Sequence, residues 1–305
     1  MNIFVIVLPI FLIILLGYAL KARGLVEESW VHVLNSFVYY VSLPAIILVS
    51  FWEINWSEKS ILPAVGFNVL AVLAFAILLA LVLSRFKLDG KIKAAIFMAA
   101  VVGNTVYMGF PIMQEAFGAE NFAHVTAIAT PHLILNLILA IVMIEFWVVK
   151  SRKLKTYFYD FIKNPLVLGL LFGVLLSLLQ LEGYHVQILK KPLSMLGATA
   201  SPVALFALGA FIHGKFIQKH FGLTVLVSAL KLIVFPLFVL LLTNWFSLSS
   251  IGISVSALVA AMPVAVTTFV IAEQYKLDKA FVANAILIST AVSIVTISMF
   301  LLKLV

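Results

Sequence analysis

The amino-acid sequence predicts an all-α membrane protein with ten transmembrane helices, arranged as two inverted five-helix repeats. Three observations lead to this fold class: an apolar composition, ten long apolar stretches, and matching features about half a chain apart. Of 305 residues, 64% are hydrophobic and 10% are charged, and the mean hydropathy is +1.21. Soluble domains are roughly half apolar and about a quarter charged, so these stretches belong in a lipid bilayer. The sequence has no cysteine, which excludes disulfide bonds and thiol chemistry.

The apolar stretches have the length of membrane helices. A bilayer core of about 30 Å is crossed by about 20 apolar residues in a helix, and continuous apolar runs lack the alternation of barrel strands. The first stretch has no basic residue before Lys21, so we interpret it as a retained span and not as a signal peptide. Nine or eleven spans remain alternatives. The predicted spans are residues 3–20, 31–52, 61–84, 92–112, 122–149, 165–181, 191–213, 222–243, 250–274 and 280–303.

The basic residues predict the orientation of these spans. Of the 20 Lys and Arg residues, fifteen fall beside loops 1–2, 3–4, 5–6, 7–8 and 9–10. The exceptions are Lys59, Lys190, Lys191 and Lys303 on the opposite side, and Lys231 within a span. Because Lys and Arg collect on the cytoplasmic side, we expect those five loops in the cytoplasm and both termini outside the cell. Topology thus accounts for the net charge of +8 without a nucleic-acid partner.

Similar features recur about half a chain apart. Pro44 and Pro202 are 158 residues apart, and Gly103 and Pro263 are 160 apart. A repeat of five spans crosses the membrane an odd number of times, so its second copy is inverted, as in many secondary transporters. We therefore divide the chain into a first repeat (residues 1–149), a cytoplasmic connecting loop (150–164) and a second repeat (165–305).

Two spans carry helix-breaking residues near their middles. Gly103 and Asn104 lie about halfway along span 4, and Pro263 lies about halfway along span 9. Proline removes a backbone donor, and glycine makes unwinding easy. In hydrocarbon such a break persists only where it is buried in protein or lines a cavity. The repeat-related placement predicts broken helices that cross each other; the alternative is that these residues only kink their helices.

The predicted crossing has the chemistry of an anion site. Each half-helix that starts after a break would point its positive end inward, which suits an anion. We expect the side chains of Asn104, Thr105 and Thr267 to add hydrogen bonds, together with the backbone at Gly103 and at Pro263–Val264. Thr268 is a further candidate of the same kind.

Other polar residues lie inside predicted spans. Lys231 could balance a carboxylate, since intramembrane charges are functional by default, or tie down a broken helix through its carbonyls; both interpretations stay open. Asn136 could serve the substrate or a cation, or join helices by a hydrogen bond. We interpret His132 as a hydrogen-bonded structural histidine and Glu145 as an interfacial residue.

Several motifs together resemble the auxin efflux carrier family, within the bile-acid/sodium symporter-like superfamily, and the chain is similar to its short bacterial-type members. The matching stretches are Asn104-Thr105-x-x-Met108-Gly109-x-Pro111, Pro263 with Phe269, Ala272 and Tyr275, residues 201–210, and residues 37–44. The resemblance implies crossing helices 4 and 9, a scaffold of spans 1, 2, 6 and 7, elevator-like movement of the other spans, and a homodimer. It implies carboxylates such as malate or malonate as substrates. Gly103 stands where the family has proline, and the connecting loop is short.

From these patterns we expect a secondary active transporter of small organic anions, either carboxylates or auxin-like acids, in the cell membrane. A proton or sodium ion could couple transport, and membrane lipid surrounds the chain. No catalytic residue, cofactor or metal site is predicted, because no Walker loop, paired carboxylates or histidine pair occurs in the spans. The alternatives are a passive channel or a membrane scaffold protein; an intramembrane enzyme is disfavoured because no acid, base or metal group lies near the midplane.

Overall fold

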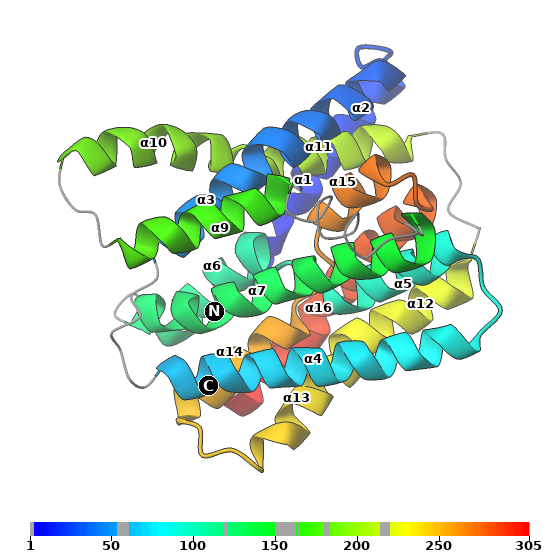
Figure 1. Cartoon of the computed structure of the whole chain (residues 1–305). Helices are drawn as coiled ribbons and strands as arrows, with labels where there is room; N and C mark the ends of the chain where they lie inside the picture. Colours follow the sequence, from blue (N-terminus) through cyan, green and yellow to red (C-terminus); the bar gives the residue numbers. More distant parts are fainter. Residues whose placement is uncertain are drawn as a thin grey trace.

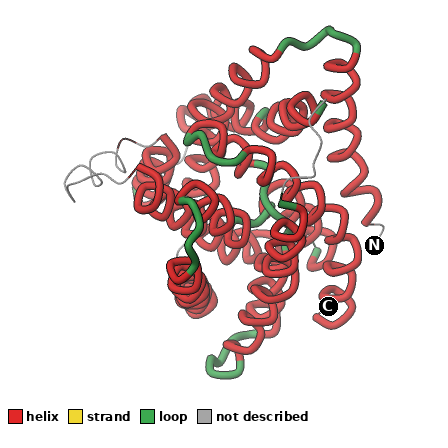
Figure 2. The backbone as a smooth tube through the Cα atoms, turned by 90° about the vertical axis from the view of Figure 1, so that its right-hand side faces the viewer, coloured by secondary structure: helices red, strands yellow, loops and turns green. Residues whose placement is uncertain are grey.

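The computed structural model of the chain describes residues 3–53, 61–118, 121–149, 163, 165–179, 184–213 and 220–304. Within these ranges every named element is helical, as the uniform helices of Figure 2 show. The first half contains α1 (Ile3–Ala22), α2 (Glu28–Phe37), η1 (Val38–Ser42), α3 (Leu43–Trp52), α4 (Ile61–Arg85), α5 (Gly90–Val101), η2 (Thr105–Gly109), α6 (Phe110–Phe117), α7 (Phe122–Ile144) and η4 (Glu145–Val149). The second half contains α9 (Pro165–Leu178), α10 (Tyr184–Ala198), α11 (Ala200–Ile212), α12 (Phe221–Ala229), η5 (Leu230–Val234), α13 (Phe235–Thr243), α14 (Ser250–Ala261), α15 (Thr267–Gln274) and α16 (Lys279–Leu304).

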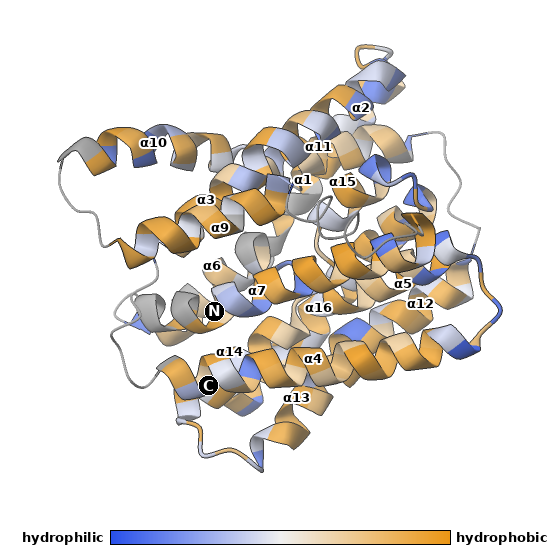
Figure 3. Ribbon diagram, in the orientation of Figure 1, coloured by the Kyte–Doolittle hydropathy of each residue, from blue (hydrophilic) through white to orange (hydrophobic). Residues whose placement is uncertain are grey.

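The helices have the length and surface of membrane spans. Among the described residues, six continuous helical stretches are long and apolar enough to cross a bilayer, and three shorter apolar helices accompany them. Large apolar side chains such as Leu81 on α4 and Leu241 on α13 are exposed, and Figure 3 shows how strongly apolar these helices are. Water would oppose such exposure, whereas lipid tails accept it. The all-helical membrane class is confirmed; the count of ten spans in two inverted repeats stays a prediction.

The helices form two groups, which lie one above the other in Figure 1 and are in contact with each other. The upper bundle, named for its place in that view, consists of α1, α2, η1, α3, α9, α10 and α11, where α1 packs on α11 and α3 on α9. The lower bundle contains the remaining elements, including α5 and α14. Helix α15 connects the bundles, because it packs on α16 and also on α2 and α11.

Glycines bring the helices of the upper bundle into backbone contact. A Cβ atom on Gly209 would overlap the carbonyl oxygen of Ile14, and one on Gly17 would overlap that of Phe206. Gly169 faces the carbonyl oxygen of Pro44 in the same way. Small residues at such contacts allow close packing of membrane helices, so the upper bundle is held together along its backbones.

Three π-helical turns precede prolines. The turns η1, η2 and η5 each end two residues before a proline, namely Pro44, Pro111 and Pro236. A proline lacks the N–H of its own turn and its ring collides with the carbonyl four residues earlier. A wider turn just before the ring relieves that collision, and such turns often occur at functional sites. The turn η5 is important here because it contains Lys231.

Candidate functional site

The two predicted helix breaks are present and lie against each other. Helix α5 ends at Val101 before η2, and α14 ends at Ala261 before α15. The Asn104 N–H donates to the carbonyl oxygen of Pro263 at 2.7 Å, and the Ala265 N–H donates to that of Val102 at 3.1 Å. Gly103 and Val264 therefore form an isolated antiparallel bridge. The two unwound segments satisfy part of each other's backbone in the interior of the lower bundle, as a break in a membrane helix requires.

Asn104 carries the least satisfied side chain of the first break. Its side chain is buried, and among the described residues neither the amide nitrogen nor the amide oxygen has a hydrogen-bond partner. Its backbone is well satisfied, since its carbonyl oxygen accepts from the N–H groups of Met108 and Gly109 at 3.2 and 3.1 Å. Buried amides are almost always paired, so an unpaired amide held by a paired backbone indicates a place for a ligand.

Thr105 is buried next to this amide in the sequence. Its N–H donates to the carbonyl oxygen of Gly103 at 2.8 Å. The Thr105 hydroxyl lies 3.5 Å from the same oxygen, which is too long for a strong hydrogen bond. The hydroxyl is therefore weakly bound in this conformation.

The backbone of the second break is hydrogen-bonded to a side chain of α16. The Val264 N–H, which the sequence assigned to a substrate carboxylate, donates to the Ser289 hydroxyl oxygen at 3.0 Å. That hydroxyl in turn donates to the carbonyl oxygen of Ile286 at 3.2 Å. Pro263 contributes its carbonyl oxygen to Asn104. In this conformation both backbone groups are engaged inside the protein, and Ser289 is a structural partner to which the sequence assigned no role.

The two threonines after the second break, Thr267 and Thr268, differ in the hydrogen bonding of their hydroxyl groups. Thr267 opens α15, and its buried hydroxyl has no hydrogen-bond partner. Thr268 is also buried, but its hydroxyl donates to the carbonyl oxygen of Ala265 at 2.6 Å. Of the two, only the hydroxyl of Thr267 has its hydrogen free for a ligand.

Lys231 lies between the two breaks. It is fully buried, and its Nζ donates to the carbonyl oxygen of Ala260 at 2.6 Å, in the last turn of α14. The Nζ also lies 4.8 Å from the ring centre of Phe235. A Cβ atom on Gly103 would come within 3.0 Å of the Nζ, so the lysine tip rests against the first break. This geometry supports the tie to a broken helix and puts the amine between the first unwound segment and the last turn of α14.

His132 belongs to a polar network that joins the three helices α4, α7 and α14. Its Nδ1 is 3.0 Å from the Asn68 amide oxygen, and the Asn68 amide nitrogen donates to the Ser256 hydroxyl at 2.8 Å. The His132 ring stacks on Phe235 with 5.8 Å between ring centres. The interpretation of His132 as a hydrogen-bonded structural residue agrees with these contacts. Asn68 and Ser256 were not predicted, because no local pattern connects residues 188 positions apart.

Asn136 and Glu145 are two buried polar residues, one on α7 and the other at the start of the π-helical turn η4 that follows it. Asn136 is buried on α7, which packs on α5 and α6, and its amide oxygen has no hydrogen-bond partner. Glu145 begins η4 and is buried. The structure thus places Gly103 against both Lys231 and Val264, whereas Asn136 lies on α7, a helix that packs on α5.

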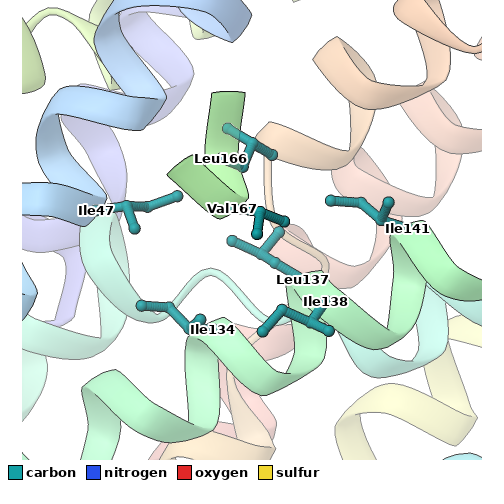
Figure 4. Close-up of a pocket in the computed structure, with 7 residues that line it drawn as sticks. All are labelled: Ile47, Ile134, Leu137, Ile138, Ile141, Leu166 and Val167. Carbon is teal, nitrogen blue, oxygen red and sulfur yellow. The ribbon is translucent and has the colours of Figure 1, made fainter. Parts of the chain in front are cut away.

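A narrow pocket between the two bundles differs from the helix breaks because only apolar side chains line it. Figure 4 shows its lining, which comes from α3 and α9 on one side and α7 on the other. All lining residues are aliphatic: Ile47, Ile134, Leu137, Ile138, Ile141, Leu166 and Val167. With no polar group to pair with, a carboxylate would lose its hydration there without compensation. We therefore assign the anion chemistry to the helix breaks and not to this pocket.

These features define a class of protein: a multi-pass membrane protein whose polar site is built from interrupted helices, as in transporters. The chain belongs to the membrane transport protein family, whose model matches residues 2–156 and 147–301. This match confirms the resemblance to auxin efflux carriers.

Curated relatives cover nearly the whole chain. An uncharacterized transporter of Methanocaldococcus jannaschii is 26% identical over 300 residues, with 96% of each chain covered. One from Methanothermobacter thermautotrophicus is 25% identical over 292 residues, with 95% of each chain covered. A Rhizobium meliloti protein named "Putative malonate transporter" is 27% identical over 306 residues, covering 96% of this chain and 92% of its own.

Proposed function

We propose that this chain is a secondary active carrier of small organic anions, with short carboxylates such as malonate as its substrate class. The observation that carries the proposal is the buried, unpaired Asn104 amide at the junction of two broken helices, beside Lys231. The name of the Rhizobium relative supports the choice of carboxylates.

Each group has a role in this proposal. The Asn104 amide nitrogen donates to a carboxylate oxygen, and the Thr105 and Thr267 hydroxyls add donors. Lys231 supplies positive potential, and the N-terminal end of α15, which starts at Thr267, adds the partial charge of a helix dipole. The bridge between Gly103 and Val264 holds the two segments in register, while Asn136 contacts the substrate from α7.

The proposed mechanism is alternating access by an elevator-type movement of the lower bundle against the upper bundle. The glycine contacts support a rigid upper bundle, and both helix breaks belong to the lower bundle. The aliphatic lining in Figure 4 supports sliding at that part of the boundary, because the lining residues are all apolar. At α15, the hydrogen bond from Gln274 to Tyr40 and the contact between His32 and Glu273 would have to break. The proposal includes ten spans in two inverted repeats, a homodimer, and a cell-membrane location with both termini outside the cytoplasm.

The test uses the purified chain reconstituted into liposomes and labelled malonate as the probe. A carrier exchanges substrate, so liposomes loaded with unlabelled malonate will accumulate label transiently above equilibrium, and uptake will saturate. The malonate recovered afterwards will be chemically unchanged. Uptake without counterflow or saturation would favour the passive channel. No uptake of malonate, malate or an auxin-like acid would overturn the proposal.

A further inference from the structure

Lys231 has no acidic partner on the elements that surround it. Its turn η5 packs on α5, α12, α13, α14 and α16, and the sequences of these five helices contain no Asp or Glu. Their charged residues are Lys91 and Lys93 in the first turn of α5, and Lys279 and Lys303 in the terminal turns of α16. The charged groups on these packing elements are therefore all cations, and all lie at helix ends.

Among the described residues, His132 is a further titratable group near Lys231, since both contact the ring of Phe235. Phe235 lies under the Lys231 Nζ and stacks on His132, which approaches from α7. The His132 Nδ1 is bound to Asn68, and its buried Nε2 has no hydrogen-bond partner. His132 supplies no negative charge, so it does not neutralise an ammonium at Lys231.

The partners of Lys231 compensate a positive charge only in part. The Ala260 carbonyl oxygen and the Phe235 ring are neutral groups that attract a cation. A fully buried ammonium requires a full counter-charge to offset its lost hydration. A neutral amine, by contrast, still donates to the Ala260 oxygen, so the tie to α14 persists without the charge.

The missing counter-charge matches the anion of the proposed function, on which this inference rests. We propose that Lys231 is the site of a proton that binds together with the anion and crosses the membrane with it. In the empty carrier Lys231 is a neutral amine; when the anion enters, the amine takes one proton from water and becomes the ammonium that pairs with it. On release the proton and the anion leave together. A monovalent anion then crosses without net charge, and a divalent anion carries one negative charge.

Proton and anion must increase each other's affinity, because coupling between two sites is reciprocal. The anion affinity falls as the pH rises, by up to about tenfold per pH unit, which is the limit for one linked proton. Arginine does not release its proton in proteins, so Lys231→Arg uncouples the two ligands.

The experiment is proton uptake on binding, measured with a pH indicator on the purified full chain in weakly buffered detergent. Malonate is the probe, added at a pH well above its own ionisation range so that it arrives as the dianion. We expect the wild type to take up close to one proton per malonate bound. Lys231→Arg and Lys231→Gln bind without uptake, Lys231→Gln more weakly, and His132→Gln keeps the uptake.

The outcomes separate this inference from the proposed function. Wild-type binding of malonate without proton uptake overturns the role of Lys231 and leaves the carrier proposal intact. Uptake that persists in both Lys231 variants but disappears in His132→Gln also overturns it, and moves the proton to His132. Because the wild-type measurement is informative by itself, the inference stays testable even if a Lys231 variant does not fold. Absence of binding by malonate and by the other anions overturns the proposed function and this inference with it.

Discussion

The two helix breaks share one backbone bridge but differ in how the polar groups nearest that bridge are paired. They share one bridge, with one hydrogen bond on each side of Gly103 and Val264. At the first break the Asn104 amide is buried without a partner, whereas at the second break the Val264 N–H is paired with Ser289. Under the proposed function, the first break binds the ligand, and the contact with Ser289 holds the second break in shape.

Glycine and proline explain part of this difference. Pro263 has no N–H to satisfy, so the second break unwinds with one donor fewer. Gly103 has no Cβ, and this leaves room for the Lys231 Nζ beside the first break. The first break thus has space for the lysine tip beside Gly103, whereas the Val264 N–H of the second break is bound by the Ser289 hydroxyl.

The largest expected effect comes from Asn104→Ala. Loss of the donor weakens malonate binding by about 1–3 kcal/mol, which is the usual effect of removing a buried hydrogen-bond partner. Stability changes little, because the amide has no partner in the empty protein. The measurement is binding to purified, monodisperse protein, with the midpoint of denaturant unfolding recorded in parallel.

Asn68→Ala is the matched control, since Asn68 is equally buried but fully paired with His132, Ser256 and Ala64. It should lower stability and leave affinity nearly unchanged. Wild-type affinity in Asn104→Ala would show that the Asn104 amide does not bind the ligand. The proposed difference in function between the two breaks would then be wrong.

Ser289→Ala tests the second break. It leaves the buried Val264 N–H without an acceptor, which costs about 1–3 kcal/mol of the free energy of unfolding. Ser298→Ala on the same helix is the control, because that hydroxyl only donates to the Ile294 carbonyl oxygen at 2.6 Å and no backbone donor depends on it. Unchanged stability in Ser289→Ala would mean that water or another group satisfies Val264 and that the second break is as open as the first.

Gly103→Ala tests the fit between the first break and Lys231. The added Cβ would be 3.0 Å from the Nζ and 3.4 Å from the Met262 Cβ. The flexible lysine tip can move, so we expect a loss of about 1 kcal/mol in stability, at the low end for overpacking, and a weaker tie to Ala260. Gly66→Ala in α4 is the control, because nothing lies within 4 Å of its added Cβ, and it should stabilise the helix slightly.

If the effect of Gly103→Ala acts through the lysine, it should shrink in a Lys231→Met background, since contacting residues are not additive. Equal losses in both backgrounds would show that the glycine is needed for its backbone conformation and not for the space it leaves.

The helices and the two breaks could be predicted because their signals are local. Apolar length defines the spans, and Gly103 and Pro263 mark the interruptions within a few residues of where they occur. The partners could not be predicted, because Ser289 and Ser256 acquire their roles only through packing of distant helices. No local pattern shows that the Val264 N–H, which stays a predicted anion donor, is bound to Ser289 of α16 in this conformation. The π-helical turns have a local signal in Pro44, Pro111 and Pro236, each of which lies two residues beyond the end of a turn.

The smallest effect, and the sharpest contrast, is expected from the adjacent threonines of α15. Thr267→Val removes a hydroxyl that has no partner, so stability should be unchanged, while malonate affinity falls by less than about 1 kcal/mol, the net worth of one hydrogen bond. Thr268→Val removes a hydroxyl that is bound to the Ala265 carbonyl oxygen, so stability should fall by about 1 kcal/mol with affinity unchanged. Both substitutions keep the shape of the side chain. Both variants are measured by malonate binding and by the midpoint of denaturant unfolding. Equal losses of affinity in the two variants would mean that α15 acts only through its position, and that the second break contributes no side chain to the anion.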